Sequence, residues 1–278
     1  MKAVRQFKLI NSAGETYDLM DVNHYFNEPS GLGFSADNRY TRVANKFTPY
    51  QNRARQGIIS GTMVFHVRAY EEYRKFILFC QKEPLTLIYT VDRENRAKVL
   101  LTDAEKTEIS HNNSRLLCKV MFTMLGMWYR VVVASNDGII GGGKVYDYTY
   151  DYTYADEIPG MVNIESDTQC ESPCIITIYG PAVNPVWRHY LNGQLMEEGA
   201  VEATIAQDRR LVIDTTSTPF RIVEVDAAGN VFADRYQDSD FSKERFVYLG
   251  AGRNRFAVGS DTTTPAVTVE ARLEYKTI

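Results

Sequence analysis

Short apolar runs separated by turn residues recur along almost the whole 278-residue sequence, and this spacing constrains the fold more than any other feature. Turn signals at intervals of roughly eight to twelve residues are typical of all-β sandwiches and barrels. The content of 18 Tyr and 13 Phe also suits pleated, half-buried surfaces. We predict strands over 4–10, 16–20, 57–67, 85–91, 97–102, 106–110, 116–124 and 128–133, then over 174–179, 187–191, 201–206, 210–215, 222–225, 231–234, 246–249, 254–259 and 267–275.

One segment has a different period. Tyr70, Tyr73, Phe76 and Cys80 recur at spacings of three and four, which predicts an amphipathic helix over 69–81. Pro84 then ends the helix, because the residue before a proline is driven out of the helical region. A lone helix among many strands differs from the alternating pattern of a nucleotide-binding parallel sheet, so that class of protein is not expected.

The length favours two domains, and a glycine-rich segment marks the division between them. This segment contains three consecutive glycines, Gly141, Gly142 and Gly143. A tandem Tyr/Asp segment follows over 146–154, and we expect it to form a solvated strand. The expected organisation is an N-terminal domain over 1–136, a linker over 137–157 and a C-terminal β-sandwich over 158–278.

Charge is distributed unevenly along the chain. Residues 1–140 contain 19 basic and 14 acidic side chains, and residues 141–278 contain 12 and 21. No run of five basic residues occurs, so we expect contacts within a protein assembly rather than with nucleic acid. The polar segment 28–56 predicts a long hairpin or loop away from the core. Its basic residues are candidate ring or arm contacts: Arg39, Arg42, Lys46, Arg53 and Arg55.

Catalytic and metal-binding patterns are weak. The four histidines are far apart in sequence, and none stands beside a Ser or Cys in a nucleophile motif. Cys170 and Cys174 lack further ligands at zinc-site spacing, so reduced thiols are expected. Glu197 and Glu198 lie in a charged, turn-like segment, where a solvated surface is favoured over an acid/base pair. We therefore expect no enzyme, with no catalytic residue, cofactor or metal, although a hydrolase built from distant residues stays open.

Trp187 and Tyr190 are the candidate contacts for a carbohydrate, since sandwich modules hold sugars on aromatic rings. Core packing is the simpler explanation of Trp187. The first ten residues carry basic side chains without an apolar run behind them, and no stretch reaches the length of a membrane span. We expect synthesis in the cytoplasm and no membrane contact.

Three segments together resemble a known family. The sequence from Gly57 to Phe65, the helix from Ala69 to Phe76 and the run from Pro84 to Tyr89 are similar to distal tail proteins of long-tailed, non-contractile bacteriophages or related prophages. Further matching segments follow in the same order: Lys106–Glu108, Leu116–Phe122, Trp128–Tyr129, Gly180–Pro185, Phe246–Phe256 and Glu270–Tyr275.

This resemblance implies a fold and a role. The N-terminal domain would be a tail-tube-like split β-barrel with one α-helix, and the C-terminal domain a galectin-like or carbohydrate-module-like sandwich. The protein would form a homohexameric ring at the virion tail tip, assembled in the host cytoplasm. Its partners would be the tail tube protein, the tape measure and the tail-associated or receptor-binding proteins. The alternative is a carbohydrate-binding module or cell-surface adhesin whose partner is a cell-wall saccharide.

Overall fold

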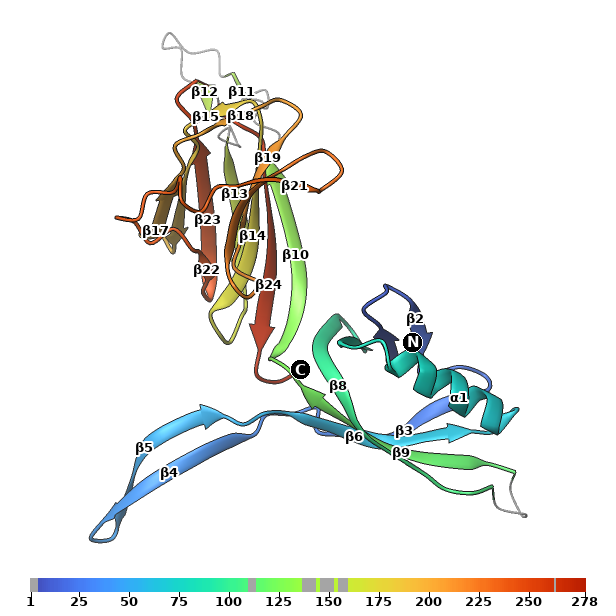
Figure 1. Ribbon diagram of the computed structural model, residues 1–278. Coiled ribbons are helices and arrows are strands. Elements are labelled where there is room, and N and C mark those ends of the chain that lie inside the picture. Colours follow the sequence, from blue (N-terminus) through green and yellow to red (C-terminus); the bar gives the residue numbers. More distant parts are fainter. Residues whose placement is uncertain (1–4, 110–113, 137–143, 146–152, 155–159, 263) are drawn as a thin grey trace. The chain divides into compact units, whose positions relative to one another are not determined.

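The computed structural model describes residues 5–109, 114–136, 144–145, 153–154, 160–262 and 264–278. Over these residues the chain is mainly β with one helix, and it divides into two compact units (Figure 1). Unit 1 comprises Met1–Arg130 and Tyr275–Ile278, and unit 2 comprises Val131–Glu274. The predicted fold class, mainly β with a helix near residue 70, is confirmed.

Unit 1 consists of two sheets that share one long strand. Its elements are β1 (Gln6–Ile10), β2 (Thr16–Asp18), β3 (His24–Ser30), β4 (Ala36–Val43), β5 (Lys46–Ala54), β6 (Ile58–Phe65), α1 (Ala69–Cys80), β7 (Leu85–Thr90), β8 (Glu94–Lys106), β9 (Leu116–Met124) and the first residues of β10 (Trp128–Asn136). One sheet has the order β2-β1-β7-β8, and the other has the order β3-β6-β9-β8. Val99 of β8 pairs with Leu85 of β7 on one side and Met124 of β9 on the other.

The prediction of two strands over 97–102 and 106–110 is wrong, because β8 is one continuous strand from Glu94 to Lys106. Its ladder with β9 shifts register between Leu101 and Asp103 and then continues to Lys106. Asp103 and Glu105 look like turn residues in the sequence, but both are exposed, so the strand extends past them without burying a charge. The first hairpin follows expectation, with Gly14 at a φ of 77° between β1 and β2.

Helix α1 covers the predicted range within one residue. Phe76 and Cys80 are buried on its apolar face, and the Phe76 ring lies 6.1 Å from the ring of Phe65 in β6. Glu71 and Glu72 occupy the first turn, where acidic side chains complement the helix dipole. At 12 residues α1 is too short to cross a membrane, and no other helix of the described residues could do so.

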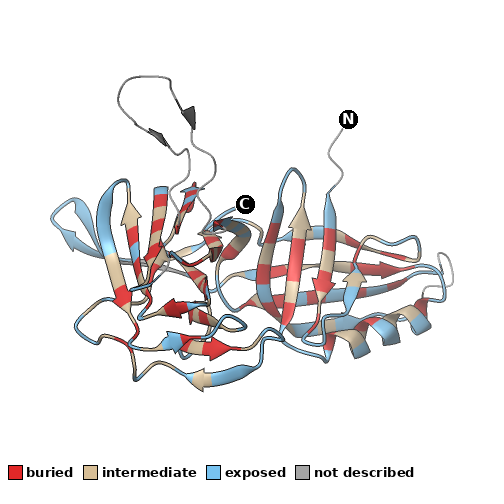
Figure 2. Ribbon diagram, turned by 90° about the horizontal axis from the view of Figure 1, so that it is seen from above, coloured by how far each residue is buried: buried red, intermediate tan, exposed pale blue. Residues whose placement is uncertain are grey.

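Unit 2 is a two-sheet sandwich. Besides most of β10 it contains β13 (Met161–Ser166), β14 (Ser172–Tyr179), β15 (Ala182–Val183), β16 (Val186–Leu191), β17 (Gln194–Ala200), β18 (Thr204–Ile205), β19 (Arg210–Asp214), β20 (Arg221–Val225), β21 (Val231–Asp234), β22 (Tyr248–Leu249), β23 (Gly252–Gly259) and β24 (Val267–Tyr275). One sheet has the order β10-β24-β14-β19-β20-β21 and the other β13-β23-β16-β17. Buried and less buried residues alternate along β24 and β14, as expected for strands with one face on a core. Figure 2 shows buried and exposed residues on the strands of the structure.

Strands β13 and β17 were not predicted from the sequence. The expectation that Glu197 and Glu198 lie in a turn is wrong, because both belong to β17, which pairs with β16. Each carboxylate faces a basic partner on β16: Glu197 Oε2 lies 2.6 Å from His189 Nδ1, and Glu198 Oε1 accepts a hydrogen bond from Arg188 Nε at 3.0 Å.

The expected linker over 137–157 falls mostly outside the described residues. Within it the structure describes β11 (Lys144–Val145) and β12 (Thr153–Tyr154), which pair as a short antiparallel ladder. The three glycines at 141–143 and most of the tandem Tyr/Asp segment lie outside the described part of the chain.

Candidate functional surfaces: a basic arm and an aromatic pocket

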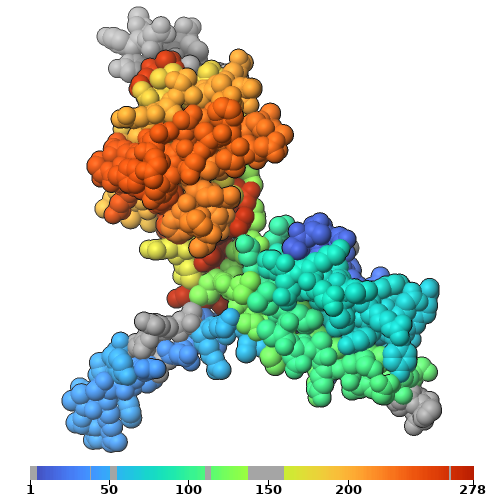
Figure 3. Space-filling model, viewed as in Figure 1, coloured from blue at the N-terminus to red at the C-terminus, as the bar shows by residue number. Residues whose placement is uncertain are grey.

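Strands β4 and β5 form a hairpin, called the arm below, that spans residues 36–54. Its ladder runs from Ala36 opposite Ala54 to Val43 opposite Lys46. A two-residue connection with Ala44 at a φ of 53° joins the strands, the turn geometry that matches their twist. Figures 1 and 3 show the arm extending away from the rest of unit 1.

The arm carries large apolar side chains without a core to receive them. Tyr40, Val43, Phe47 and Tyr50 are each more than half exposed. The Arg42 guanidinium lies 5.9 Å above the ring of Phe47, its partner across the ladder, and Arg42 Nε donates a hydrogen bond to the Ala44 carbonyl. Clustered exposed apolar residues with a polar surround mark an interaction surface more often than a free one.

The five candidate basic contacts are brought to this one hairpin and its base. Arg39, Arg42 and Lys46 are exposed on the arm. Arg53 lies in β5 opposite Asp37, and its side chain is outside what the structure describes. Arg55 follows the arm and is exposed, with its backbone N–H donating to the Ser35 carbonyl. With one acidic residue against these five basic ones, residues 36–55 have a net positive charge.

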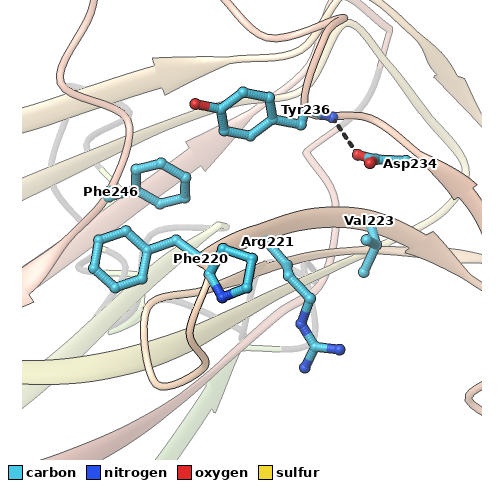
Figure 4. A pocket seen from close by; sticks show the side chains of 7 residues that line it. Phe220, Arg221, Val223, Asp234, Tyr236 and Phe246 are labelled. Atoms are coloured by element: carbon cyan, nitrogen blue, oxygen red, sulfur yellow. Dashed lines mark hydrogen bonds between the residues drawn. The ribbon is translucent and has the colours of Figure 1, made fainter.

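Unit 2 contains a pocket that sequence reasoning missed. Its volume is about 550 Å³, and its lining residues come from the segments around β20, β21 and β22: Pro219, Phe220, Arg221, Val223, Asp234, Tyr236 and Phe246. The aromatic rings lie together on one side, with Val223 and Asp234 on the other (Figure 4). These residues come from three separate segments of the sequence and form no motif. The pairing of β20 with β21 brings Val223 and Asp234 together, and Phe246 comes from the segment before β22.

The three rings of the pocket contact one another. The Phe220 and Phe246 ring centroids are 5.1 Å apart, and the rings of Phe246 and Tyr236 are nearly parallel at 6.3 Å. Arg245 fixes this arrangement, since its guanidinium lies 5.0 Å from the Tyr236 ring and 5.4 Å from the Phe246 ring. Its Nη2 also donates to the Tyr236 hydroxyl at 3.0 Å.

Two charged side chains complete the lining. Asp234 is exposed, and its Oδ1 accepts a hydrogen bond from the Tyr236 backbone N–H at 2.9 Å. Arg221 donates from Nη2 to Asp214 at 3.0 Å and from Nε to the Ser217 hydroxyl at 3.2 Å. The pocket therefore combines aromatic faces with hydrogen-bonding groups that are held in place by their neighbours.

The sequence-based carbohydrate candidate at Trp187 does not coincide with this pocket. Trp187 is 1% exposed, and its Nε1 donates a hydrogen bond to the Arg245 carbonyl at 3.0 Å. A sugar cannot stack on a ring in this position, so the structure supports the core-packing explanation of Trp187. Tyr190 is half-buried beside a register shift in the β16–β17 ladder.

Two of the described histidines and three of the four cysteines are buried. His24 and His189 are buried, and His189 lies between Glu197 and Asn254, with Nε2 at 3.0 Å from Asn254 Oδ1. Burial raises the pKa of the Cys80 thiol to about 12 and that of Cys118 to about 11. Among the described residues no three His, Cys, Asp or Glu side chains lie close enough to hold a metal ion.

Comparison with known proteins finds one family model that is similar to the N-terminal unit. Residues 6–125, from the start of β1 to the residue after β9, match the model described as the N-terminal domain of the distal tail protein. Residues 6–125 are similar to this domain of distal tail proteins. The resemblance inferred from the strand, helix and strand over 57–89 is thereby confirmed. No curated protein matches the sequence.

Solved structures extend the likeness of fold to both units of the chain. A chain of the phage P2 baseplate, in its activated conformation with Ca, is 17% identical with a TM-score of 0.69, over 99% of this chain and 100% of that chain. The Dit protein of SPP1, described as a paradigm of the hub adsorption apparatus in phages that infect Gram-positive hosts, is 8% identical with a TM-score of 0.63, over 95% and 98% of the two chains. At such identities these matches show the fold alone.

Proposed function

We propose that this chain is a structural hub at the distal end of a phage tail. In this role it forms a hexameric ring that joins the tail tube to tail-tip or baseplate and receptor-binding proteins. The observation that carries the proposal is the match of residues 6–125 to the distal tail protein domain. The fold of both units, which is similar to a baseplate chain and to a hub protein of two phages, supports it.

The arm supports self-assembly. A closed ring uses two different patches on each subunit, one meeting the other on the next copy. The arm offers one such patch, positively charged with exposed Tyr40, Phe47 and Tyr50. Residues 141–278 have an excess of nine acidic side chains, so in a neighbouring copy they offer a charge complementary to that of the arm. An acidic surface of another tail protein would offer the same complementarity.

The remaining parts of the proposal concern domains and partners. Residues 1–136 form the ring and contact the tail tube protein and the tape measure. The sandwich over 158–278, joined through 137–157, contacts the tail-associated and receptor-binding proteins. The role is structural, without catalysis, a cofactor, nucleic acid or a membrane, and the protein is made in the host cytoplasm before it enters the virion tail tip.

Immunogold electron microscopy of intact virions tests this role. Antibodies against the purified chain are expected to label the tail at the end farthest from the capsid. Antibodies against the tail tube protein serve as the control, since they are expected to label the whole tail length. Label from the chain's antibodies along the tube, on the capsid or nowhere on the particle would contradict a distal hub.

A further inference from the structure

We propose that the aromatic pocket of unit 2 binds a saccharide. The pocket is the one lined by Phe220, Tyr236, Phe246, Arg221 and Asp234. This inference does not depend on the hub role, because it rests on the lining of the pocket alone.

The apolar side of the pocket fits one side of a sugar ring. The C–H groups of a pyranose form an apolar face, which packs on an aromatic ring whose π-face carries partial negative charge. Phe220 is 41% exposed, and the Tyr236 and Phe246 rings beside it are half-buried. Because Arg245 lies over both half-buried rings and binds the Tyr236 hydroxyl, the rings are ordered before a ligand arrives.

The polar side of the pocket fits the hydroxyl groups. A carboxylate oxygen accepts hydrogen bonds and a guanidinium donates them, so an Asp and an Arg can hold neighbouring hydroxyls of one sugar. Asp234 uses Oδ1 to accept from the Tyr236 backbone, and Arg221 uses Nε and Nη2 toward Ser217 and Asp214. These bonds orient both side chains and leave further acceptor and donor positions on each.

The size of the pocket favours a saccharide over a protein partner. Small-ligand pockets have volumes of roughly 300–1,000 Å³, whereas a stable protein interface uses about 20–30 residues a side. The pocket measures about 550 Å³ and is lined by seven residues. Its dimensions therefore suit one or two sugar rings.

Saturation-transfer NMR on the full chain tests the proposal. The probes are glucose, galactose, N-acetylglucosamine and rhamnose, each titrated separately at millimolar concentrations. At least one probe is expected to show transfer to its ring protons. Phe220→Ala is expected to abolish that transfer, and Asp234→Asn to weaken binding about tenfold, the change that corresponds to about 1.4 kcal/mol.

Phe232→Ala is the matched control. Phe232 is an exposed phenylalanine of β21 that does not line the pocket, so its loss is expected to leave sugar binding unchanged. Melting temperatures of all variants check that unit 2 stays folded, and Phe220→Leu, which keeps an apolar side chain without a ring, should also lose the transfer signal.

Three results would overturn the saccharide site. These are no transfer from any probe, equal loss in Phe232→Ala and Phe220→Ala, or unchanged binding in Phe220→Ala. If Phe220→Ala instead weakened the binding of another purified tail protein while no sugar bound, the pocket would belong to a protein contact. Immunogold labelling at the tail end would be unaffected by any of these results, so failure of the site and failure of the hub role are distinguishable.

Discussion

Asp214 ends β19 and organises the turn that leads to the aromatic pocket. Its Oδ1 accepts hydrogen bonds from the Thr216 hydroxyl and from the backbone N–H groups of Thr216 and Ser217, while Oδ2 binds Arg221. Burial of this carboxylate acts to raise its pKa, but the hydrogen bonds from Thr216, Arg221 and Ser217 outweigh burial and lower the pKa overall. One buried carboxylate thus positions Arg221 at the pocket.

This arrangement makes stability depend on pH in a defined direction. Because the folded-state pKa of Asp214 is lowered, the carboxylate stabilises the fold above its unfolded-state pKa of about 3.9, and that contribution is lost as the pH falls through the folded-state value. We expect Asp214→Asn to lower the free energy of unfolding by about 2 kcal/mol at pH 7, with the difference from the unmodified chain shrinking below pH ~4.

Urea unfolding at a series of pH values measures this effect. Asp226→Asn is the control, because the Asp226 carboxylate is solvent-exposed and bonded mainly to Asn230, so its replacement should change stability less at neutral pH. A difference between Asp214→Asn and the unmodified chain that stayed constant down to acid pH would show that the carboxylate charge of Asp214 is not the stabilising group.

At the residue scale, the sequence indicated the basic residues of the arm but not the residues that line the aromatic pocket. The basic residues of the arm could be recognised because they lie within one continuous polar segment. Phe220 and Phe246 could not, because each is one of many aromatic residues and their proximity arises from long-range pairing. Trp187 was a candidate sugar contact because of its aromatic ring, yet its indole is buried in the core and donates a hydrogen bond to the Arg245 carbonyl.

At the level of elements, β17 packs against Trp187 of β16 at Gly199, which has no side chain. Gly199 of β17 is directly opposite Trp187 of β16, and a Cβ at Gly199 would overlap the indole ring. We expect Gly199→Ala to destabilise the protein by about 1–3 kcal/mol, since overpacked cores must shift side chains or backbone. Gly259 of β23 has open space where a Cβ would be, so Gly259→Ala is the matched control and should change the free energy of unfolding far less.

Urea unfolding followed by Trp fluorescence gives the free energies of unfolding of Gly199→Ala and Gly259→Ala. Hydrogen exchange of peptides from β16 and β17 should show whether Gly199→Ala loosens these two strands first. Equal stability of Gly199→Ala and Gly259→Ala would contradict the packing of Trp187 against β17.

The arm provides a second prediction for an element. Arg39→Glu combined with Arg42→Glu reverses charge on an exposed surface, so the melting temperature is expected to change little. Ring assembly is expected to fail, because the reversed charges would repel an acidic neighbour. Multi-angle light scattering after size exclusion measures the oligomer. Arg253→Glu reverses the charge of an exposed arginine of β23, outside the arm, and is the control that should assemble normally.

If the double variant assembled as well as the unmodified chain, the positive charge of the arm would not contribute to the ring. If Arg253→Glu also failed to assemble, net charge rather than the arm would govern assembly.

Elements with strong periodicity could be predicted from the sequence, and elements with charges inside a strand could not. Helix α1 and strands β9 and β24 begin and end at or within one residue of their expected positions, because their apolar residues repeat with one period. The sequence pattern did not predict the full length of β8, which contains Asp103, or strand β17, which contains Glu197 and Glu198. There the acidic side chains are exposed or bound to basic partners on the adjacent strand, which sequence alone does not reveal.

At the scale of the whole molecule, two β-rich units carry two different surfaces. Unit 1 contains the segment similar to the distal tail protein domain and the arm with its basic residues, and unit 2 contains the aromatic pocket. The structure divides the chain at Arg130, within β10, because that strand contributes residues to both units.

Native mass spectrometry of the purified full chain, alone and mixed with the tail tube protein, tests the proposed hub most directly. We expect a species of six copies, formed by the chain alone at high concentration or on addition of the tail tube protein. A chain that stayed monomeric at every concentration and formed no complex with the tail tube protein would contradict it.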